Sequence, residues 1–480
     1  MNNSYIYIVR FSGEFGTKDK STRWRLIQKL ENNIKAALLN YLPEALIKHF
    51  EVKGEWDKVF VKSPVNLIHI LDHISGISSY CRTFPFEYNS LDDIAVKAKE
   101  LFLSKIKGKR FAVRCKKSGP VPFSGKEVEV AVGDQLYLHG KVDLSKPEVT
   151  CFVEIHTDTF FLYDKKHAGM GGLPIGSQGN ALCLLSGGFD SSVAAWHLFR
   201  SGVNLDFVYF DLGGDAQKAC IVNSFFFLKT QWGHGNKGNL YIVDFIPLIK
   251  EILKGRPAFQ NMILKYCFYI CAEKLSEQFK SLALVTGESI GQVSTQTLKN
   301  LSALDKVADI AIIRPLVTFD KESIIKLSRQ IGTHDLAYKG KELCAIAGKG
   351  VVTGTTFEKL IKAVSPLSLD LLIDNALSNK TLVNDNEKNA IDANEVIPEF
   401  AKVIDLRTFE EFSSRSLNNT QNIPFDVAIM GFYHWDKSLE YFLVCNVGSQ
   451  SAILANSMLN EGFKVNHLKS GLSRFLKATL

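Results

Sequence analysis

Short apolar runs alternate with longer stretches of helical length in the middle of the chain. The runs are 181–185 (Ala-Leu-Cys-Leu-Leu), 206–210, 240–243 and 282–286, and each has the length and composition of a buried strand. The stretch 261–275 has the length of a helix. This alternation predicts a parallel α/β sheet, in which ligands bind at the carboxyl ends of the strands.

A polar segment with two glycines directly follows the first of these runs. It reads Ser186-Gly187-Gly188-Phe189-Asp190-Ser191-Ser192, and the helical stretch 193–199 comes after it. The glycines let backbone N–H groups approach a phosphate, and the helix start directs its N–H groups and positive dipole end at an anion. The segment therefore predicts an anion site, and an ordinary strand–turn–helix connection is the alternative. No lysine follows the glycines, so this is not the Gly-x-x-x-x-Gly-Lys-Ser/Thr loop.

The segment Ser186–Ser192 resembles the SGGxDS pyrophosphate loop of the ATP-pyrophosphatases. Those enzymes split ATP between its α- and β-phosphates and adenylate an oxygen of a second substrate. The resemblance implies that ATP binds at this loop and that Asp190 orders the loop or a Mg²⁺ ion. We assign no set of protein residues as metal ligands.

The first 166 residues have the pattern of two smaller α+β units. Residues 5–11 alternate as a strand does, and apolar side chains recur at helical spacing over 23–42. A second unit includes helical stretches at 91–103 and 128–138. Two separate N-terminal domains are therefore expected.

A basic strand is predicted in the second unit. The run 110–117 (Arg-Phe-Ala-Val-Arg-Cys-Lys-Lys) alternates basic and apolar residues, and Lys105, Lys107 and Lys109 precede it. A strand with one charged face suits contacts to RNA phosphates, and a merely solvated face is the alternative. We select four residues as candidate RNA ligands: Arg110, Arg114, Lys116 and Lys117. The run, together with Val142–Glu148 (Val-Asp-Leu-Ser-Lys-Pro-Glu), resembles the THUMP RNA-binding domain.

Composition limits the class of protein and its partners. Of the 480 residues, 46% are hydrophobic and 22% are charged, as in soluble globular proteins of several domains. The net charge of +7 fits a polyanionic partner, although a mildly basic protein needs none. The nine cysteines contain no Cys-x-x-Cys pair, so neither a zinc site nor a disulfide framework is indicated. With no apolar run long enough to span a membrane, a cytoplasmic protein is expected.

The last part of the chain predicts another small α/β domain. Residues 378–394 are rich in Asn, Asp and Lys and are interpreted as a linker. The segment 403–412 resembles the "DxRxxxEF" strand and turn of rhodanese domains. Further on, Cys445 lies between an apolar strand, 441–444, and a predicted helix start. N–H groups at such a helix start stabilise a thiolate or persulfide, whereas core packing is the alternative for a lone cysteine.

A longer signature identifies the family that the chain resembles. The stretch 286–301 (Thr-Gly-Glu-Ser-Ile-Gly-Gln-Val-Ser-Thr-Gln-Thr-Leu-Lys-Asn-Leu) is similar to that of the tRNA 4-thiouridine sulfurtransferases, the ThiI family, and Arg314-Pro315-Leu316 continues it. The resemblance implies an α/β multidomain fold with a central parallel sheet. Its expected parts are a ferredoxin-like domain (1–60), a THUMP domain (61–166), an ATP-pyrophosphatase domain (167–377), a linker (378–397) and a rhodanese-like domain (398–480).

The resemblance also implies a reaction and its residues. Uridine eight of a tRNA is adenylated, and its O4 is replaced by sulfur carried as a persulfide on Cys445 and supplied by a cysteine desulfurase. Cys344 then forms a disulfide with Cys445, and that disulfide is reduced before the next turnover. The implied ATP ligands are Leu184, Leu185, Ser186, Gly187, Gly188, Asp190, Ser191, Ser192, Lys265, Gly287 and Gln296.

Some positions depart from the family pattern, and other functions stay open. The family's "LKRMM" helix has Tyr266 in place of the arginine, Gly348-Lys349-Gly350 replaces "KSP", and the rhodanese loop lacks an arginine. Cys267 and Cys271 are interpreted as packing residues. One alternative is a sulfur carrier for a small molecule, since the family also serves thiamine thiazole synthesis, with a sulfur-carrier protein as partner. The other is a non-catalytic RNA-binding protein.

Overall fold

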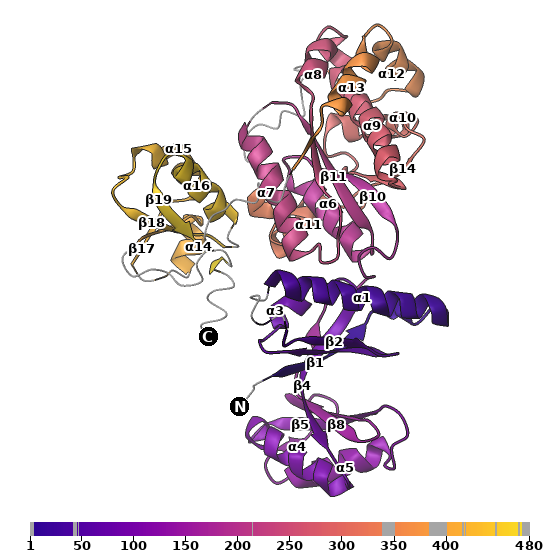
Figure 1. Ribbon diagram of the computed structural model, residues 1–480, viewed down its shortest axis with the longest axis vertical. Helices are drawn as coiled ribbons and strands as arrows, with labels where there is room; N and C mark the ends of the chain where they lie inside the picture. Colours follow the sequence, from indigo (N-terminus) through magenta and orange to yellow (C-terminus); the bar gives the residue numbers. More distant parts are fainter. Residues whose placement is uncertain are drawn as a thin grey trace. The chain divides into compact units, whose positions relative to one another are not determined.

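The computed structural model describes residues 4–41, 46, 48–213, 215–337, 351–383, 401–414, 417, 419–446, 449–468 and 471–472. The chain divides into two compact units (Figure 1). Met1–Ser177 and Arg200–Gly202 form the first, and Gln178–Phe199 and Val203–Leu480 form the second. Both combine helices with sheets, which confirms the predicted α/β multidomain class.

The first unit contains one nine-stranded sheet in the order β2-β3-β1-β4-β8-β7-β5-β6, with β9 paired to β4. Its strands are β1 (Tyr5–Phe11), β2 (Glu51–Gly54), β3 (Lys58–Ser63), β4 (Ile77–Glu87), β5 (Arg110–Lys117), β6 (Lys141–Val142), β7 (Val149–Ile155), β8 (Thr159–Tyr163) and β9 (His167–Ala168). Its helical elements are η1 (Gly13–Phe15), α1 (Lys20–Tyr41), α3 (Ile68–Leu71), α4 (Leu91–Ile106) and α5 (Gly125–Leu136).

Strand β4 joins the two parts of this sheet. Its residues 77–83 pair with β1, and its residues 84–87 pair with β8. The helix α1 covers the strands on the β1 side because Ile27, Leu30 and Ile34 recur on one face and are buried against them (Figure 1). The β5 side has its own core under α4 and α5. The two predicted α+β patterns are therefore built on one continuous sheet.

Local sequence explains where α4 and α5 begin. The Ser90 hydroxyl accepts from the Asp93 N–H, and the Ser124 hydroxyl accepts from the Glu127 N–H. The side chains at both third positions bond back to the cap residue, so each helix starts with a capping box. These caps fix the helix that precedes β5 and the helix that follows it.

The second unit contains a six-stranded sheet in the order β14-β13-β10-β11-β12-β15. Its strands are β10 (Asn180–Leu184), β11 (Asn204–Asp211), β12 (Leu240–Asp244), β13 (Ala283–Val285), β14 (Ala311–Ile313) and β15 (Thr381–Leu382). Its helical elements are α6 (Phe189–Arg200), α7 (Asp215–Gln231), α8 (Ile246–Ile252), η2 (Pro257–Phe259), α9 (Gln260–Phe279), η3 (Ser294–Gln296), α10 (Leu298–Leu304), α11 (Lys321–Gln330), η4 (His334–Leu336), α12 (Phe357–Val364) and α13 (Leu369–Ser378).

The predicted parallel sheet is confirmed, with one addition. Pairs β10–β11, β10–β13, β11–β12 and β13–β14 are parallel, whereas β15 adds an antiparallel edge beside β12. Leu182 and Val208 face a core that includes α9, and Phe207 contacts Phe199 of α6 and Phe225 of α7 on the other face. Helices on both faces explain why these strands are apolar throughout.

A separate four-stranded sheet is formed by residues that follow β15 in the sequence. Its strands are β16 (Lys402–Asp405), β17 (Thr420–Asn422), β18 (Glu440–Val444) and β19 (Lys464–His467), all parallel, in the order β17-β16-β18-β19. The helical elements are α14 (Phe409–Ser414), α15 (Phe425–Gly431), η6 (Phe432–His434) and α16 (Ser449–Asn460). Leu443 of β18 and Leu454 of α16 belong to its main core.

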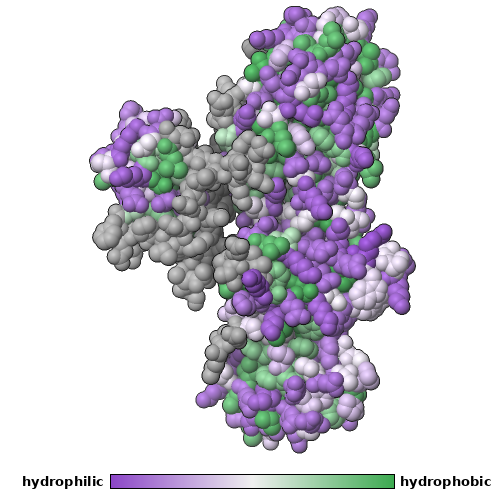
Figure 2. Space-filling view, in the orientation of Figure 1, coloured by the Kyte–Doolittle hydropathy of each residue, from purple (hydrophilic) through white to green (hydrophobic). Residues whose placement is uncertain are grey.

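Hydrophilic residues cover most of the face shown in Figure 2, with hydrophobic residues in scattered groups. Among the described helices, none combines the length and apolar character needed to cross a membrane.

Candidate functional site

The predicted anion loop joins β10 to α6, and the hydroxyl of Ser191 shapes it. The backbone N–H of Ser186 donates to Ser191 Oγ at 3.0 Å, and the same oxygen lies 3.3 Å from the carbonyl oxygen of Gly188. Ser191 is buried, so its side chain is committed to the loop. The loop is thereby bent at the start of a 12-residue helix, a position whose free backbone N–H groups suit an anion.

A second segment packs directly against the loop. A Cβ atom on Gly287 would lie 2.6 Å from the backbone nitrogen of Ser191 and 2.7 Å from the carbonyl carbon of Asp190. Backbone atoms cannot yield at such distances, so only glycine allows this approach. Two segments that both follow neighbouring parallel strands, β10 and β13, therefore meet at the carboxyl edge of the sheet.

Lys265, predicted to contact phosphate, is tied to the residue after Gly287. Its Nζ lies 3.2 Å from Glu288 Oε1. The other carboxylate oxygen of Glu288 accepts from the Tyr269 hydroxyl at 2.6 Å and from Arg314 Nε at 2.9 Å. Burial alone would raise the pKa of Glu288, but Lys265, Arg314 and Tyr269 outweigh it and lower that pKa to about 2. The carboxylate is therefore ionised and brings two cations to this edge.

Gln296, also predicted from the sequence, closes the short helix η3. Its Oε1 is buried and has no hydrogen-bond partner among the residues that the structure describes. A buried amide oxygen without a partner is costly, and a ligand that donates to it removes that cost. The described residues contain no group of three or more His, Cys, Asp or Glu side chains that could hold a metal ion.

The predicted basic strand is β5, but its cations differ in their surroundings. Arg110 pairs with Glu148 at 3.2 Å, and Lys116 pairs with Asp57 at 3.0 Å. Arg114 donates to the carbonyl oxygen of Leu144 at 2.6 Å, and Lys117 donates to that of Val121 at 3.3 Å. Of the four, Arg114 is half-buried and the other three are exposed. The charged face is therefore real, and some of its charge is already balanced by acidic neighbours.

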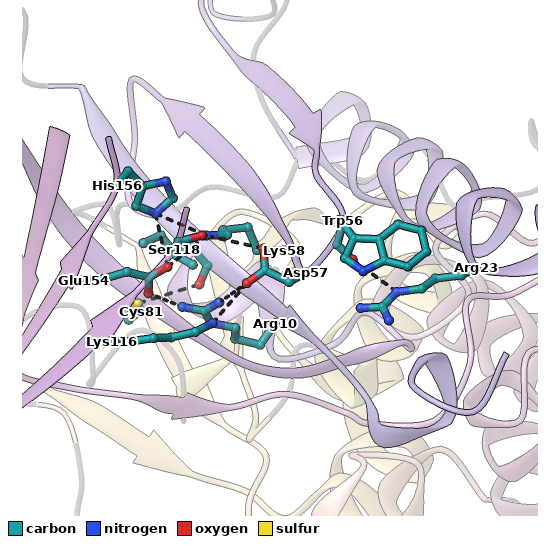
Figure 3. Close-up of polar contacts among 11 residues, drawn as sticks. Arg10, Arg23, Trp56, Asp57, Lys58, Cys81, Lys116, Ser118, Glu154 and His156 are labelled. Atoms are coloured by element: carbon teal, nitrogen blue, oxygen red, sulfur yellow. Dashed lines mark hydrogen bonds and ion pairs between the residues drawn. The ribbon is translucent and has the colours of Figure 1, made fainter. Parts of the chain in front are cut away.

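A buried network lies beside this strand (Figure 3). Lys58 and Glu154 are both fully buried and lie 3.0 Å apart, while Arg10 pairs with Glu154 and with Asp57. His156 Nε2 lies 3.3 Å from the same carboxylate. Burial alone would raise the pKa of Glu154, but His156, Arg10 and Lys58 lower it to about 2. The network joins strands β1 and β3 to β7 and fixes Arg10 and Asp57 beside β5.

A cavity of about 410 Å³ opens in the same region. It is lined by cationic and aromatic side chains, among them Arg10, Arg114, Lys116, Lys166, Phe152 and Tyr163. The Phe152 and Tyr163 rings stack with centroids 5.0 Å apart, and Lys166 Nζ lies 4.1 Å from the centroid of the Phe152 ring. Four cations beside stacked rings suit a phosphorylated, aromatic ligand such as a nucleotide unit of RNA.

Cys445 directly follows β18, as the sequence predicts, and is 1% exposed. Its Sγ accepts from the Ser451 N–H at 3.4 Å and lies 3.4 Å from Ser451 Oγ. That hydroxyl lies 3.3 Å from Nδ1 of His467. Asp405, the last residue of the neighbouring strand β16, pairs at 2.7 Å with Arg407, which follows that strand. The N–H of a residue in the first turn of α16 thus contacts the sulfur, which favours a thiolate.

The structure describes two of the three other cysteines discussed from the sequence. Cys267 and Cys271 are fully buried in the core around α9, which confirms that they are packing residues. Burial raises the pKa of the Cys267 thiol to about 12, so it is inert. Cys344 lies outside the described residues, and its pairing with Cys445 therefore stays a prediction.

Sequence reasoning missed two groups of residues. Tyr269 lies in α9, whereas Glu288 and Arg314 follow β13 and β14. Glu288 and Arg314 were noted only as parts of motifs without a role, and Tyr269 was not noted. The helix start after Cys445 was predicted, but the contact between Ser451 of that helix and His467 had no signal in the sequence. The available clue for Glu288 was a carboxylate that directly follows Gly287, just past the end of an apolar strand.

Three family models match successive parts of the chain. They are the ThiI ferredoxin-like domain at residues 6–81, the THUMP domain at 88–164, and the thiamine biosynthesis protein (ThiI) model at 176–369. The chain is 27% identical to a 4-thiouridine synthetase whose crystal structure contains RNA and bound ATP. That likeness has a TM-score of 0.69 and covers 79% of this chain and 99% of the other. The fold and the matched domains define an RNA-modifying sulfurtransferase enzyme.

Curated relatives match along nearly the whole chain. The tRNA sulfurtransferase of Colwellia psychrerythraea is 32% identical over 95% of this chain and 98% of its own length. That of Desulfurococcus amylolyticus is 31% identical over 98% of both chains. The chain belongs to the tRNA sulfurtransferase family.

Proposed function

We propose that this enzyme converts a uridine of tRNA, at position eight, to 4-thiouridine in an ATP-dependent reaction. The observation that carries the proposal is the contact of Gly287 with the backbone of Asp190 and Ser191, which joins the family signature to the anion loop. The ATP bound to a structurally similar synthetase supports the same assignment.

The loop Ser186–Ser192 binds the triphosphate through backbone N–H groups at the start of α6. The uridine O4 attacks the α-phosphorus, the bond to the β-phosphate oxygen breaks, and pyrophosphate leaves. Lys265 neutralises charge that develops on the leaving group, and Gln296 accepts from the nucleotide. Asp190 would offer one carboxylate to a Mg²⁺ ion, whose charge would help to neutralise the phosphates.

Sulfur then replaces the activated oxygen. Cys445 accepts sulfur from the persulfide of a cysteine desulfurase, and the terminal sulfur of its own persulfide attacks C4 of the base while AMP leaves. The Cys344 thiolate attacks the sulfur of Cys445, which breaks the S–S bond, leaves sulfur on the base and joins the two cysteines as a disulfide. A thiol reductant restores both thiols.

The tRNA binds to the first unit through Arg110, Arg114, Lys116 and Lys117 and the adjoining cavity. These cations contact phosphates and give affinity without base specificity. The tRNA substrate implies a cytoplasmic enzyme.

Sulfur delivery to thiamine thiazole synthesis is a second candidate function, which the description of one matching model favours. It passes sulfur from Cys445 to a sulfur-carrier protein and needs no adenylation at the loop. A variant that cannot adenylate at the loop Ser186–Ser192 should therefore lose tRNA thiolation and keep sulfur delivery to the carrier protein.

Nucleoside analysis tests the main proposal. tRNA from cells that lack this protein should contain no 4-thiouridine, and the native protein should restore it. Asp190→Ala should not restore it, although the variant still binds tRNA because the β5 cations lie in the other unit. Normal thiolation by Asp190→Ala would rule out the loop as the adenylation site.

A further inference from the structure

We propose that Glu288 is a positioning residue, which fixes Lys265 for the cleavage of ATP. The inference rests on the proposed function, because it takes ATP to be the substrate at the loop Ser186–Ser192. It assigns a task to a buried carboxylate that itself need not contact the nucleotide.

The burial of Glu288 requires compensation, and two cations provide it. The Glu288 side chain is 3% exposed, Arg314 is 9% exposed and Lys265 is 23% exposed. An isolated carboxylate this deeply buried would be strongly unfavourable. Arg314 also pairs at its outer end with Asp305, at 2.6 Å. Lys265 is thus the more accessible of the two cations that Glu288 holds.

The two carboxylate oxygens have different partners. Oε2 accepts from the Tyr269 hydroxyl at 2.6 Å, from Thr286 Oγ1 at 3.1 Å and from Arg314 Nε at 2.9 Å. Oε1 has the ion pair with Lys265 and no hydrogen-bond partner among the described residues. The bonds at Oε2 hold the carboxylate still, so Oε1 is a fixed anchor for the flexible lysine.

The anchor is connected rigidly to the loop. Glu288 directly follows Gly287, whose backbone packs against that of Asp190 and Ser191. One peptide unit therefore links the contact with the loop to the carboxylate that holds Lys265. A cation fixed in this way needs no reorganisation when charge develops on the leaving pyrophosphate.

This arrangement predicts separate effects on kcat and on KM for ATP. Removing the charge of Glu288 leaves Lys265 and Arg314 less neutralised, so the site attracts the triphosphate at least as strongly. The ammonium loses its fixed position, however, and stabilises the transition state less. A residue with only a structural role would weaken ATP binding, turnover and stability together.

The test measures kcat and KM for ATP in tRNA thiolation, with thermal unfolding of each variant. Glu288→Gln should lower kcat by about 100-fold, the scale of a misplacement near 1 Å, and should leave KM for ATP unchanged or lower. Glu288→Asp keeps the charge and should recover kcat to within about 10-fold of the native value. Asp374→Asn, in α13, is the matched control. It removes an exposed 2.6 Å ion pair with Lys274, which lies on α9 as Lys265 does. It should leave both constants unchanged.

Tyr269→Phe supplies a second measurement if Glu288→Gln does not fold. It removes one hydrogen bond from the anchor and keeps its charge, so kcat should fall several-fold at constant KM. A native kcat in folded Glu288→Gln or in Tyr269→Phe would overturn the inference, as would a rise in KM that follows the loss of stability. If the native enzyme needs no ATP for thiolation, the proposed function itself fails. If the native enzyme needs ATP and the variants match it, only the role of Glu288 fails.

Discussion

Gly287 leaves no room for a side chain against Ser191, because a Cβ atom there would lie 2.6 Å from the Ser191 backbone nitrogen. Gly287→Ala should therefore displace the start of α6, raise KM for ATP and lower thiolation at least about 10-fold. ATP titrations and thiolation assays measure both effects. Gly133→Ala is the control, because no atom lies within 4 Å of a Cβ there and the residue is inside helix α5. It should be neutral or stabilise by about 0.5–1 kcal/mol. Equal behaviour of the two variants would show that the contact is not needed.

Neutralising the cations of β5 should weaken tRNA binding and flatten its dependence on salt. The combined glutamine variant of Arg110, Arg114, Lys116 and Lys117 should lose about one unit of slope in log K against log salt for each phosphate contact removed. ATP binding should not change. Lys97→Gln with Lys126→Gln, on the helices α4 and α5 of the same unit, removes two cations away from β5 and should change the slope much less than any two of the β5 substitutions. An unchanged slope in the β5 variant would mean that this strand face is only solvated.

Glu154 should make the first unit sensitive to acid. Its folded pKa is lowered to about 2, so its contribution to stability is complete above the unfolded value near 4.5 and is lost as pH falls toward 2. Glu154→Gln removes the buried carboxylate that pairs with Lys58 at 3.0 Å and leaves only the longer pair of Lys58 with Asp57 at 3.4 Å, so it should cost about 3 kcal/mol at pH 7. Urea unfolding should show this difference shrinking between pH 4.5 and pH 2. A difference in unfolding free energy that stays constant with pH would contradict the conclusion that Glu154 is ionised in the folded protein.

Serine variants of the two predicted sulfur-handling cysteines should block different steps of the reaction. Cys445→Ser should accept no sulfur from a desulfurase, because the atom beside the Ser451 N–H is lost. Cys344→Ser should accept sulfur but stall before the product is released, because nothing cleaves the S–S bond between Cys445 and the base. Mass spectrometry after a single turnover without reductant should show the two cysteines joined in the native enzyme. Continued turnover by Cys344→Ser with reductant present, and no such disulfide, would make an external thiol the acceptor.

Local sequence was sufficient for some parts of this site. The strand, the glycine pair and the helix start of the loop are contiguous, so 181–199 predicted both the fold and the anion site there. The position of Cys445 between a strand and a helix was predicted for the same reason, because β18 and α16 flank it. The helices α1, α4 and α5 followed from apolar spacing.

Long-range pairing could not be predicted in this way. The Arg10–Glu154 pair joins residues 144 positions apart, and the Arg314–Glu288 bond joins two strand ends 26 positions apart. Which partner neutralises a charge depends on how the strands are ordered in the sheet, and alternation of strands and helices does not specify that order. The β5 cations were selected by charge alone, so their pairing with Asp57 and Glu148 was missed.

The most direct test of the account follows the α-phosphate of ATP. The enzyme is incubated with unmodified tRNA and α-³²P-labelled ATP in the absence of a sulfur donor, and the products are separated. The account predicts labelled AMP, bound to tRNA at uridine eight or released from it, together with unlabelled pyrophosphate that is assayed separately, in amounts that depend on tRNA and vanish in Asp190→Ala. Formation of ADP and phosphate, or AMP formation that is independent of tRNA, would contradict adenylation of the RNA at this loop.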